Sequence, residues 1–184
     1  MLTLSTLGRL ARFGRDRHGV SAVEFAFIAP VMIGLYLGCV EISDGVAADR
    51  KVSLVVDALA NLSAQVTTIS TSDMTNILNA STSIISPYSV TNLKATVSCL
   101  TINSSGQATV AWSATLNGTV RATGSLVTIP SALALPNSTL LFGEATYAYT
   151  PIVGYTITGT LMLSDQMYMA PRITAPTYNG QTCT

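Results

Sequence analysis

The sequence predicts an α+β protein in which an N-terminal transmembrane helix leads into amphipathic helices and then into an antiparallel β-sheet that packs on the helix. Three observations support this fold class. An uncharged run extends from Phe25 to Val40, the apolar residues that follow recur at helical spacing, and from Leu93 onward apolar and polar residues alternate as in strands. Helices followed by a run of strands are typical of the α+β class.

Composition limits the class of protein further. The chain has 184 residues, of which 48% are hydrophobic and only 10% are charged, and its formal net charge is zero. This length allows one ordinary domain with an appendage. The charge content excludes both a disordered acidic chain and a basic protein that binds nucleic acid. We therefore expect a membrane-attached or exported protein without a nucleic-acid partner.

The first forty residues predict a membrane anchor. Residues 19–40 would rise about 33 Å as a helix, which is enough to cross a hydrocarbon core of about 30 Å. Four arginines precede this segment and three acids follow it: Arg9, Arg12, Arg15, Arg17, Glu41, Asp44 and Asp49. By the positive-inside rule, residues 1–19 are a basic cytoplasmic leader, residues 20–43 are the transmembrane helix, and the remainder lies outside the cytoplasm.

A cleaved signal peptide is the alternative. Its polarity would be the same, and residues 46–48 offer a small-residue cleavage site, so the chain could be a secreted periplasmic or extracellular binding module. Three features weaken this alternative: the apolar run is long, it opens with Glu24, and Glu41 and Asp44 crowd the cleavage region.

The segment from Arg17 to Pro30, RHGVSAVEFAFIAP, resembles the N-terminal signature of the TadE/TadG-like family. Members of this family are membrane-anchored components of the bacterial Tad (Flp, type IVb) pilus machinery. The resemblance implies a pilin-like fold, a single-pass location in the inner membrane with a periplasmic C-terminal domain, and possible incorporation into a pilus. It also implies three kinds of partner, namely other Tad pilus subunits, the assembly platform and a prepilin peptidase.

The spacing of Gly19, Glu24 and Phe25 is similar to a prepilin peptidase site. Cleavage after Gly19 would make Val20 the first residue and Glu24 the fifth. Some family members are cut in this way and others keep the segment as a plain anchor, so the resemblance leaves processing open.

Two roles for Glu24 are open. Glu24 can simply lie at headgroup depth. Alternatively, as the resemblance to pilins implies, Glu24 and Phe25 form an assembly element in which the acid neutralises the amino terminus of a neighbouring subunit. Further along the anchor, Pro30 removes one backbone donor in mid-span. Gly34 and Gly38 form a Gly-xxx-Gly pair that would let another helix approach closely.

Residues 44–88 predict an amphipathic helical region. Apolar residues recur on one stripe of a helix from about Gly45 to Thr68, which continues or closely follows the anchor. A second helix is expected after a cap at Thr71 or Ser72, and Pro87 lies beyond its end.

Residues 89–184 predict the periplasmic antiparallel sheet. Alternation indicates strands over 93–99 and 108–116, and Asn117-Gly118 predicts a hairpin into a third strand over 119–129. Two more strands are expected over 140–149 and 155–169. Two short elements here, Tyr147-x-Tyr149-x-Pro151 and Pro171-Arg172, also resemble the family.

Of the three cysteines, Cys39 falls in the predicted span, whereas Cys99 and Cys183 fall in the exported part. An oxidising periplasm would allow Cys99 and Cys183 to form a disulfide. The alternative is that Cys99 is a small core residue and Cys183 a free thiol.

The sequence does not predict an enzyme. The lone histidine is His18, and the exported region lacks a Gly-x-Ser-x-Gly elbow, a Ser-x-x-Lys pair, a metal-ligand cluster and a phosphate loop. We expect no catalytic residues, no metal and no cofactor.

Overall fold

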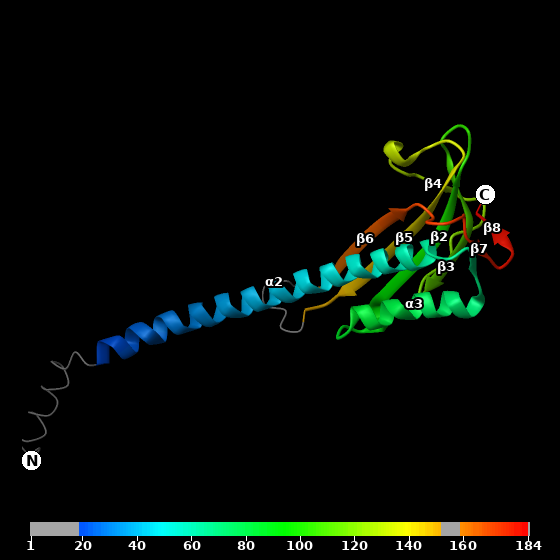
Figure 1. Cartoon of the computed structure of the whole chain (residues 1–184). Coiled ribbons are helices and arrows are strands. Elements are labelled where there is room, and N and C mark those ends of the chain that lie inside the picture. The colour runs from blue at the N-terminus through cyan, green and yellow to red at the C-terminus, as the bar shows by residue number, and fades with distance from the viewer. Residues whose placement is uncertain (1–18, 152–158, 184) are drawn as a thin grey trace, which may run out of the picture.

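One helix joins the two parts of the molecule. The structure is a computed structural model, and it describes residues 19–151 and 159–183. Helix α2 runs over 45 residues, Val20–Ala64, which corresponds to about 67 Å at 1.5 Å per residue. Its N-terminal half projects away from the rest of the chain, and its C-terminal half lies along a β-sheet (Figure 1). The predicted α+β class, with the apolar helix and a sheet packed on it, is confirmed.

The anchor and the first amphipathic helix are therefore a single element. Helix α2 passes through Pro30 without a break and ends at Ala64, four residues before the predicted end at Thr68. The chain instead turns into a short strand, β1 (Thr68–Ile69), which pairs in parallel with β7 (Thr177–Tyr178). The tertiary pairing overrides the apolar periodicity at this boundary.

Helix α3 (Thr71–Ile85) packs beside α2. Its cap is Ser70, not the predicted Thr71 or Ser72. The Asp73 N–H donates to Ser70 Oγ at 3.1 Å, and the Ser70 N–H donates to Asp73 Oδ2 at 3.0 Å. This is a capping box that uses aspartate at its third position, and it satisfies two donors that the first turn leaves free. At the other end, Lys51 Nζ on α2 donates to the Ile84 carbonyl at 2.9 Å.

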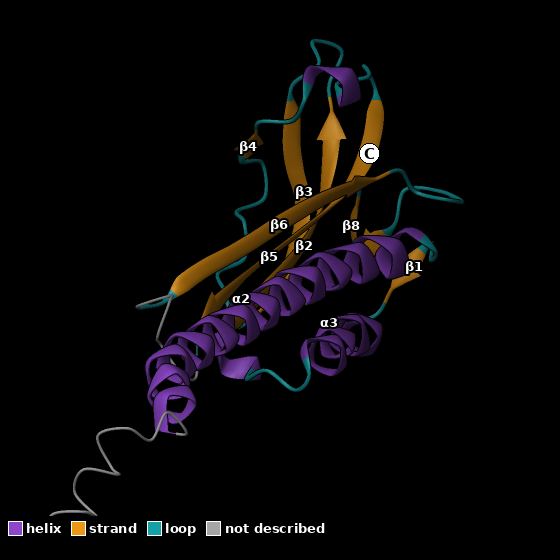
Figure 2. Cartoon of the chain, turned by 90° about the vertical axis from the view of Figure 1, so that its left-hand side faces the viewer, coloured by secondary structure: helices purple, strands orange, loops and turns teal. Residues whose placement is uncertain are grey.

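The main sheet has five antiparallel strands in the order β4-β3-β2-β5-β6 (Figure 2). Its strands are β2 (Leu93–Ile102), β3 (Ala108–Leu116), β4 (Leu126–Val127), β5 (Ser138–Tyr149) and β6 (Leu161–Met169). Short helices η2 (Val90–Asn92) and η3 (Ser131–Leu133) precede β2 and β5. A smaller sheet has the order β1-β7-β8, with β8 at Gln181–Thr182.

Two strand predictions need correction. The predicted strand over 119–129 is reduced to β4, although the pairing of Ala108 with Val127 keeps the hairpin centred on Asn117-Gly118. The intervening chain leaves strand conformation because Gly124 adopts a φ of 80° and Arg121 reaches across the sheet. The predicted strand over 155–169 begins at Leu161 in the described chain, and residues 155–158 lie outside the described residues.

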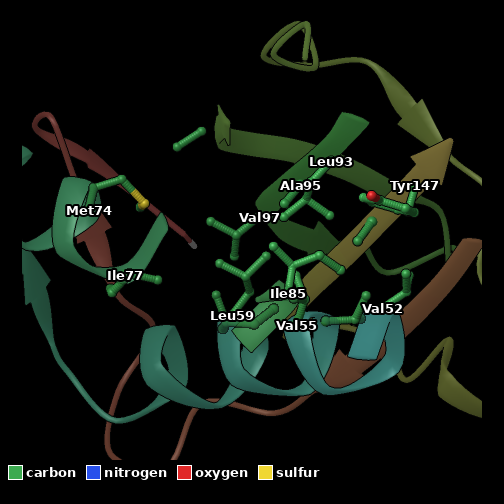
Figure 3. Packing of buried hydrophobic residues seen from close by; sticks show 14 of the residues in the cluster. Val52, Val55, Leu59, Met74, Ile77, Ile85, Leu93, Ala95, Val97 and Tyr147 are labelled. Carbon is green, nitrogen blue, oxygen red and sulfur yellow. The ribbon is translucent and has the colours of Figure 1, made fainter. Parts of the chain in front are cut away.

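The main core lies between the sheet and the two helices (Figure 3). Its labelled members come from α2, α3, β2 and β5: Val52, Val55, Leu59, Met74, Ile77, Ile85, Leu93, Ala95, Val97 and Tyr147. A Cβ placed on Gly143 of β5 would lie 2.9 Å from the Val56 carbonyl oxygen of α2. The glycine therefore permits the close approach of this strand to the helix. A second, smaller core covers one end of the opposite face of the sheet, around Phe142.

Candidate membrane anchor and its attachment to the domain

The N-terminal half of α2 exposes large apolar side chains around its whole circumference. Phe25, Phe27 and Tyr36 are 70%, 77% and 68% exposed, and Val23, Ile28, Val31, Met32, Ile33 and Leu35 are also exposed. A helix that is apolar on all sides is stable only inside a protein or a membrane. In the described part of the chain, α2 is the helix long and apolar enough to cross a membrane. It fits a single-pass membrane protein.

The candidate processing and assembly residues lie at the start of this helix. Helix α2 begins at Val20, and Gly19, Val20, Glu24 and Phe25 are all exposed. In a single chain, Glu24 therefore stands among exposed apolar neighbours such as Val23 and Phe25.

The two glycines of the Gly-xxx-Gly pair differ in exposure. Gly38 is buried by the chain's own fold, whereas Gly34 is half-buried, one turn closer to the N-terminus. Both glycines nevertheless line one open hollow on the surface of α2, together with Pro30, Val31, Leu35, Cys39 and Ile42.

A hydrogen-bonded cluster attaches α2 to the domain where the exposed half ends. Asp44 accepts hydrogen bonds from Tyr88 Oη at its Oδ1 and from Tyr149 Oη at its Oδ2, each at 2.8 Å. The Tyr88 ring lies 6.1 Å from the Tyr147 ring and 6.3 Å from the Tyr149 ring. We call Asp44, Tyr88, Tyr147 and Tyr149 the tyrosine cluster. It ties one carboxylate of the helix to the loop after α3 and to the end of β5.

The environment of the tyrosine cluster raises the pKa of the Tyr88 and Tyr149 hydroxyls. Burial, followed by the hydrogen bond to Asp44, raises the pKa of Tyr88 to about 12. The same two causes, in the same order, raise the pKa of Tyr149 even further above its usual value. Both hydroxyls therefore remain protonated donors at neutral pH.

Small residues bring the helix close to the cluster. Gly45 is buried, and a Cβ placed on it would lie 3.6 Å from Tyr149 Cε1. Glu41, one turn before, is only 4% exposed. The domain therefore lies against one face of α2 as far back as Glu41, inside the predicted span of residues 20–43.

A second attachment closes the C-terminal end of α2. The Arg172 N–H donates to the Ala64 carbonyl at 3.0 Å, and Arg172 Nη2 donates to Asn61 Oδ1 at 2.7 Å. The carbonyls of the last turn of a helix have no partner within the helix, and a cation there interacts favourably with the helix dipole. The Tyr-x-Tyr-x-Pro and Pro-Arg elements thus hold opposite ends of the helix segment that the domain contains.

The sheet face away from the helices carries an ion pair and a groove lined mainly by polar residues. Arg121 donates to both carboxylate oxygens of Glu144, at 2.9 and 2.6 Å, and its guanidinium lies 5.4 Å from the centre of the Phe142 ring. The hydrogen bonds to Glu144 raise the pKa of Arg121. Beside this pair is an open polar groove of about 580 Å³, lined by Lys94, Thr96, Gly118, Thr119, Glu144, Ala145, Thr146, Ser164, Asp165 and Gln166.

The structure joins Cys99 and Cys183 in a disulfide with a Cα–Cα distance of 6.0 Å, and Cys39 is exposed on α2. The bond fixes the C-terminal tail to the central strand β2. Among the described residues, no group of three or more His, Cys, Asp or Glu side chains is arranged to hold a metal ion.

Sequence reasoning missed the tyrosine cluster. It used Asp44 only as a flanking charge, placed Tyr147 and Tyr149 on a strand, and did not connect them with Tyr88. The available signal was the Tyr-x-Tyr-x-Pro element, whose alternate residues point to one face of β5.

An apolar helix whose N-terminal half is exposed and whose C-terminal half packs on an α+β domain fits a membrane-anchored protein of the single-pass type. Residues 19–60 match the family model described as TadE-like protein, so this segment is a TadE-like region and the resemblance to the TadE/TadG-like family is confirmed over it. A TadE-like region indicates a component associated with the Tad pilus machinery. No curated protein and no solved structure matches the chain.

Proposed function

We propose that this chain is a minor pilin or pseudopilin-like component of a bacterial Tad (Flp, type IVb) pilus, acting in pilus assembly or adhesion. The observation that best supports the proposal is the division of α2, whose TadE-like sequence is exposed and apolar in its first half and embedded in the domain in its second. The protein would be held in the inner membrane by residues 20–43, with its amino terminus in the cytoplasm and its domain in the periplasm.

Lateral association is the mechanism that this geometry supports. The exposed face around Pro30 and Gly34 would pack beside the helices of other pilus subunits, because small residues let backbones approach. Glu24 would pair with the amino terminus of a neighbour, since an ionised acid inside a bilayer is costly without a partner. The assembly platform would receive the chain, and a prepilin peptidase would act between Gly19 and Val20.

We further propose that the protein is not an enzyme. The tyrosine cluster and the pair Arg121–Glu144 both consist of residues that bond to each other across secondary-structure elements. These contacts between elements explain the presence of both groups of residues without a catalytic role.

The structure offers an argument against release by a signal peptidase near Ala48. Such a cut would fall inside α2, where Ala48 and Val52 are fully buried, and it would remove Asp44 from the tyrosine cluster. A secreted module of this kind would lose part of its own core.

The mass of the mature protein tests the proposal directly. The protein is isolated from membranes and its intact mass is measured. A start at Val20 supports processing as a pilin, an intact Met1 supports a plain anchor, and a start near Asp49 in a soluble protein overturns the proposal.

The role of Glu24 is tested by replacement with glutamine. We expect Glu24→Gln to reduce incorporation into pili while the protein remains in the membrane. Asp57→Asn, at an exposed position in the domain half of α2, is the matched control and should have no effect. Equal incorporation of the two variants would remove the pairing mechanism and leave the anchor intact.

A further inference from the structure

The depth of the domain relative to the membrane follows from the length of α2. A hydrocarbon core of about 30 Å is crossed by about 20 helical residues. Counted from Val20, these end at Cys39. Glu41, two residues further on, is only 4% exposed and lies near Tyr149 of the domain. The part of the domain around Tyr149 must therefore lie close to the outer boundary of the core.

The headgroup layer accounts for the next few residues of the helix. The two interfacial layers together add about 10 to 15 Å to the core, so each is about 5 to 7 Å thick. At 1.5 Å per residue, Asp44 lies about 7.5 Å beyond Cys39, which places the tyrosine cluster at the outer edge of this layer. If the span instead begins after Glu24, or if the helix tilts, the domain lies deeper still.

The end of the sheet that faces this layer carries polar and apolar side chains: Thr150 and Thr160, whose hydroxyl oxygens lie 3.2 Å apart, and next to them Leu161 and Met162. Tyr149, which contacts Asp44, pairs across the sheet with Leu161, and the next pair along the strands is Ala148 with Met162. Leu161 and Met162 are 42% and 61% exposed. Because successive strand residues point to opposite faces, Leu161 lies on the face of its partner Tyr149, which contacts α2, and Met162 lies on the opposite face.

Polar groups around this end are arranged as expected at a membrane surface. Asp44 is hydrogen-bonded by two tyrosines, so no bare carboxylate of this cluster faces the lipid. Lys94 is exposed opposite Thr146, which in turn pairs with Ser164, two residue pairs along the strands from Met162. A lysine at this position can direct its ammonium group to lipid phosphates while its stem lies along apolar surface.

We propose that this end of the sheet, formed by Leu161 and Met162 with Lys94 at its border, inserts into the headgroup layer of the bilayer and is a second membrane contact of the protein. The partner is a phospholipid surface. The inference rests on the proposed membrane anchoring by α2. Its consequence is that the domain is seated on the membrane while the chain is anchored there, and is not held above it on a free helix.

The test uses the full chain in vesicles of phosphatidylethanolamine and phosphatidylglycerol. Cys39→Ser removes the free thiol, the Cys99–Cys183 disulfide is kept, and one polarity-sensitive fluorophore is attached at Met162→Cys, Met32→Cys or Ser105→Cys. Ser105 lies in the turn between β2 and β3, at the end of the sheet remote from the tyrosine cluster. Each label is quenched in turn by a nitroxide on the lipid headgroup, a nitroxide on the acyl chain, and iodide in the water.

The three positions give distinguishable outcomes. We expect the headgroup nitroxide to quench residue 162 several-fold more than residue 105, and the acyl-chain nitroxide to quench residue 32 most strongly. If residue 32 is quenched by the acyl chain while residue 162 behaves like residue 105, the second membrane contact is wrong and the anchor stands. If residue 32 is open to iodide, the proposed anchoring itself is wrong.

A charge introduced at the contact provides a second test. Leu161→Asp should make the label at residue 162 more accessible to iodide and less quenched by the headgroup nitroxide. Leu135→Asp, at a leucine near the remote end of the sheet that is 64% exposed against 42% for Leu161, is the control and should leave residue 162 unchanged. Unaltered far-UV circular dichroism shows that the variants are folded, and an identical response of the two variants would overturn the inference.

Discussion

The side chain of Asp44 connects helix α2 to two other segments of the chain. Its two carboxylate oxygens each accept a hydrogen bond from a different tyrosine, one after α3 and one at the end of β5. The residue also stands where α2 leaves the domain. Three segments distant in the sequence therefore meet at one charged group.

Removing one donor of this cluster should destabilise the domain. Tyr149→Phe keeps the ring but deletes the hydroxyl, and a hydrogen bond to a charged group contributes about 1.5 to 3 kcal/mol. We expect a loss in that range in the free energy of unfolding, measured in detergent by denaturant titration with near-UV circular dichroism. Tyr36→Phe, on the exposed anchor, is the control and should change stability by less than about 0.5 kcal/mol.

Alkaline pH should weaken the same cluster. Because the pKa of Tyr88 is about 12 in the folded protein and about 10 in an unfolded chain, the folded state binds more protons between these values. The stabilisation is complete below about pH 10 and is lost as the pH rises through about 12. Tyr88→Phe should flatten this fall and remove a late step from the tyrosinate absorbance titration. An unchanged titration curve would contradict the assignment.

The helices show how far sequence patterns determine individual elements. The apolar run and the 3.6-residue periodicity predicted α2 and α3 correctly, because both patterns depend on residues close in sequence. The exact cap at Ser70 was missed, since three neighbouring hydroxyl residues could each have started α3. The end of α2 was missed because the pairing of β1 with β7, more than one hundred residues away, decides it.

The strands depend more than the helices on residues that are distant in the sequence. Alternation located β2, β3 and β5, but the segment 119–125 has a strand-like sequence and no strand. Within this segment Gly124 adopts a φ of 80°, and Arg121 bonds to Glu144 on β5, a strand distant in the sequence. Periodicity within a segment cannot reveal a partner of this kind.

Contact between α2 and the sheet leads to a prediction for Gly143. In Gly143→Ala the new Cβ would lie 2.9 Å from the Val56 carbonyl oxygen and 3.4 Å from Val56 Cγ1. The helix must then move away from β5, and overpacking of this kind costs about 1 to 3 kcal/mol. Thermal unfolding should report a lower midpoint for Gly143→Ala. Ser164→Ala, on the exposed face of β6, should retain the original midpoint, and equal midpoints would show that the interface is looser than the structure indicates.

At the scale of the whole molecule, the chain is tied together by contacts between distant segments. The Cys99–Cys183 disulfide spans 84 positions, and Trp112 Nε1 donates to the Pro176 carbonyl at 3.0 Å. The sequence supplied the two cysteines and an oxidising compartment as the reason to pair them. It could not supply the tail's position against β2, because that depends on the folded sheet.

Loss of the disulfide should therefore lower stability substantially. On the chain-entropy model, a closed loop of this length contributes about 4 to 5 kcal/mol. The double variant Cys99→Ser/Cys183→Ser should unfold at a markedly lower temperature than the parent, and dithiothreitol should lower the parent's midpoint towards that of the variant. A parent protein that titrates with two additional free thiols before reduction would contradict the bond.

The continuity of α2 from Val20 to Ala64 has one more consequence. Because successive residues of an α-helix are turned by about 100° around its axis, the azimuth of the domain around the membrane normal is fixed by the number of residues between Glu24 and Asp44. One residue inserted at Tyr36 would rotate the domain by roughly that angle relative to a partner bound to the first turns of the helix. Seven inserted residues make close to two full turns and would nearly restore the original orientation of the domain.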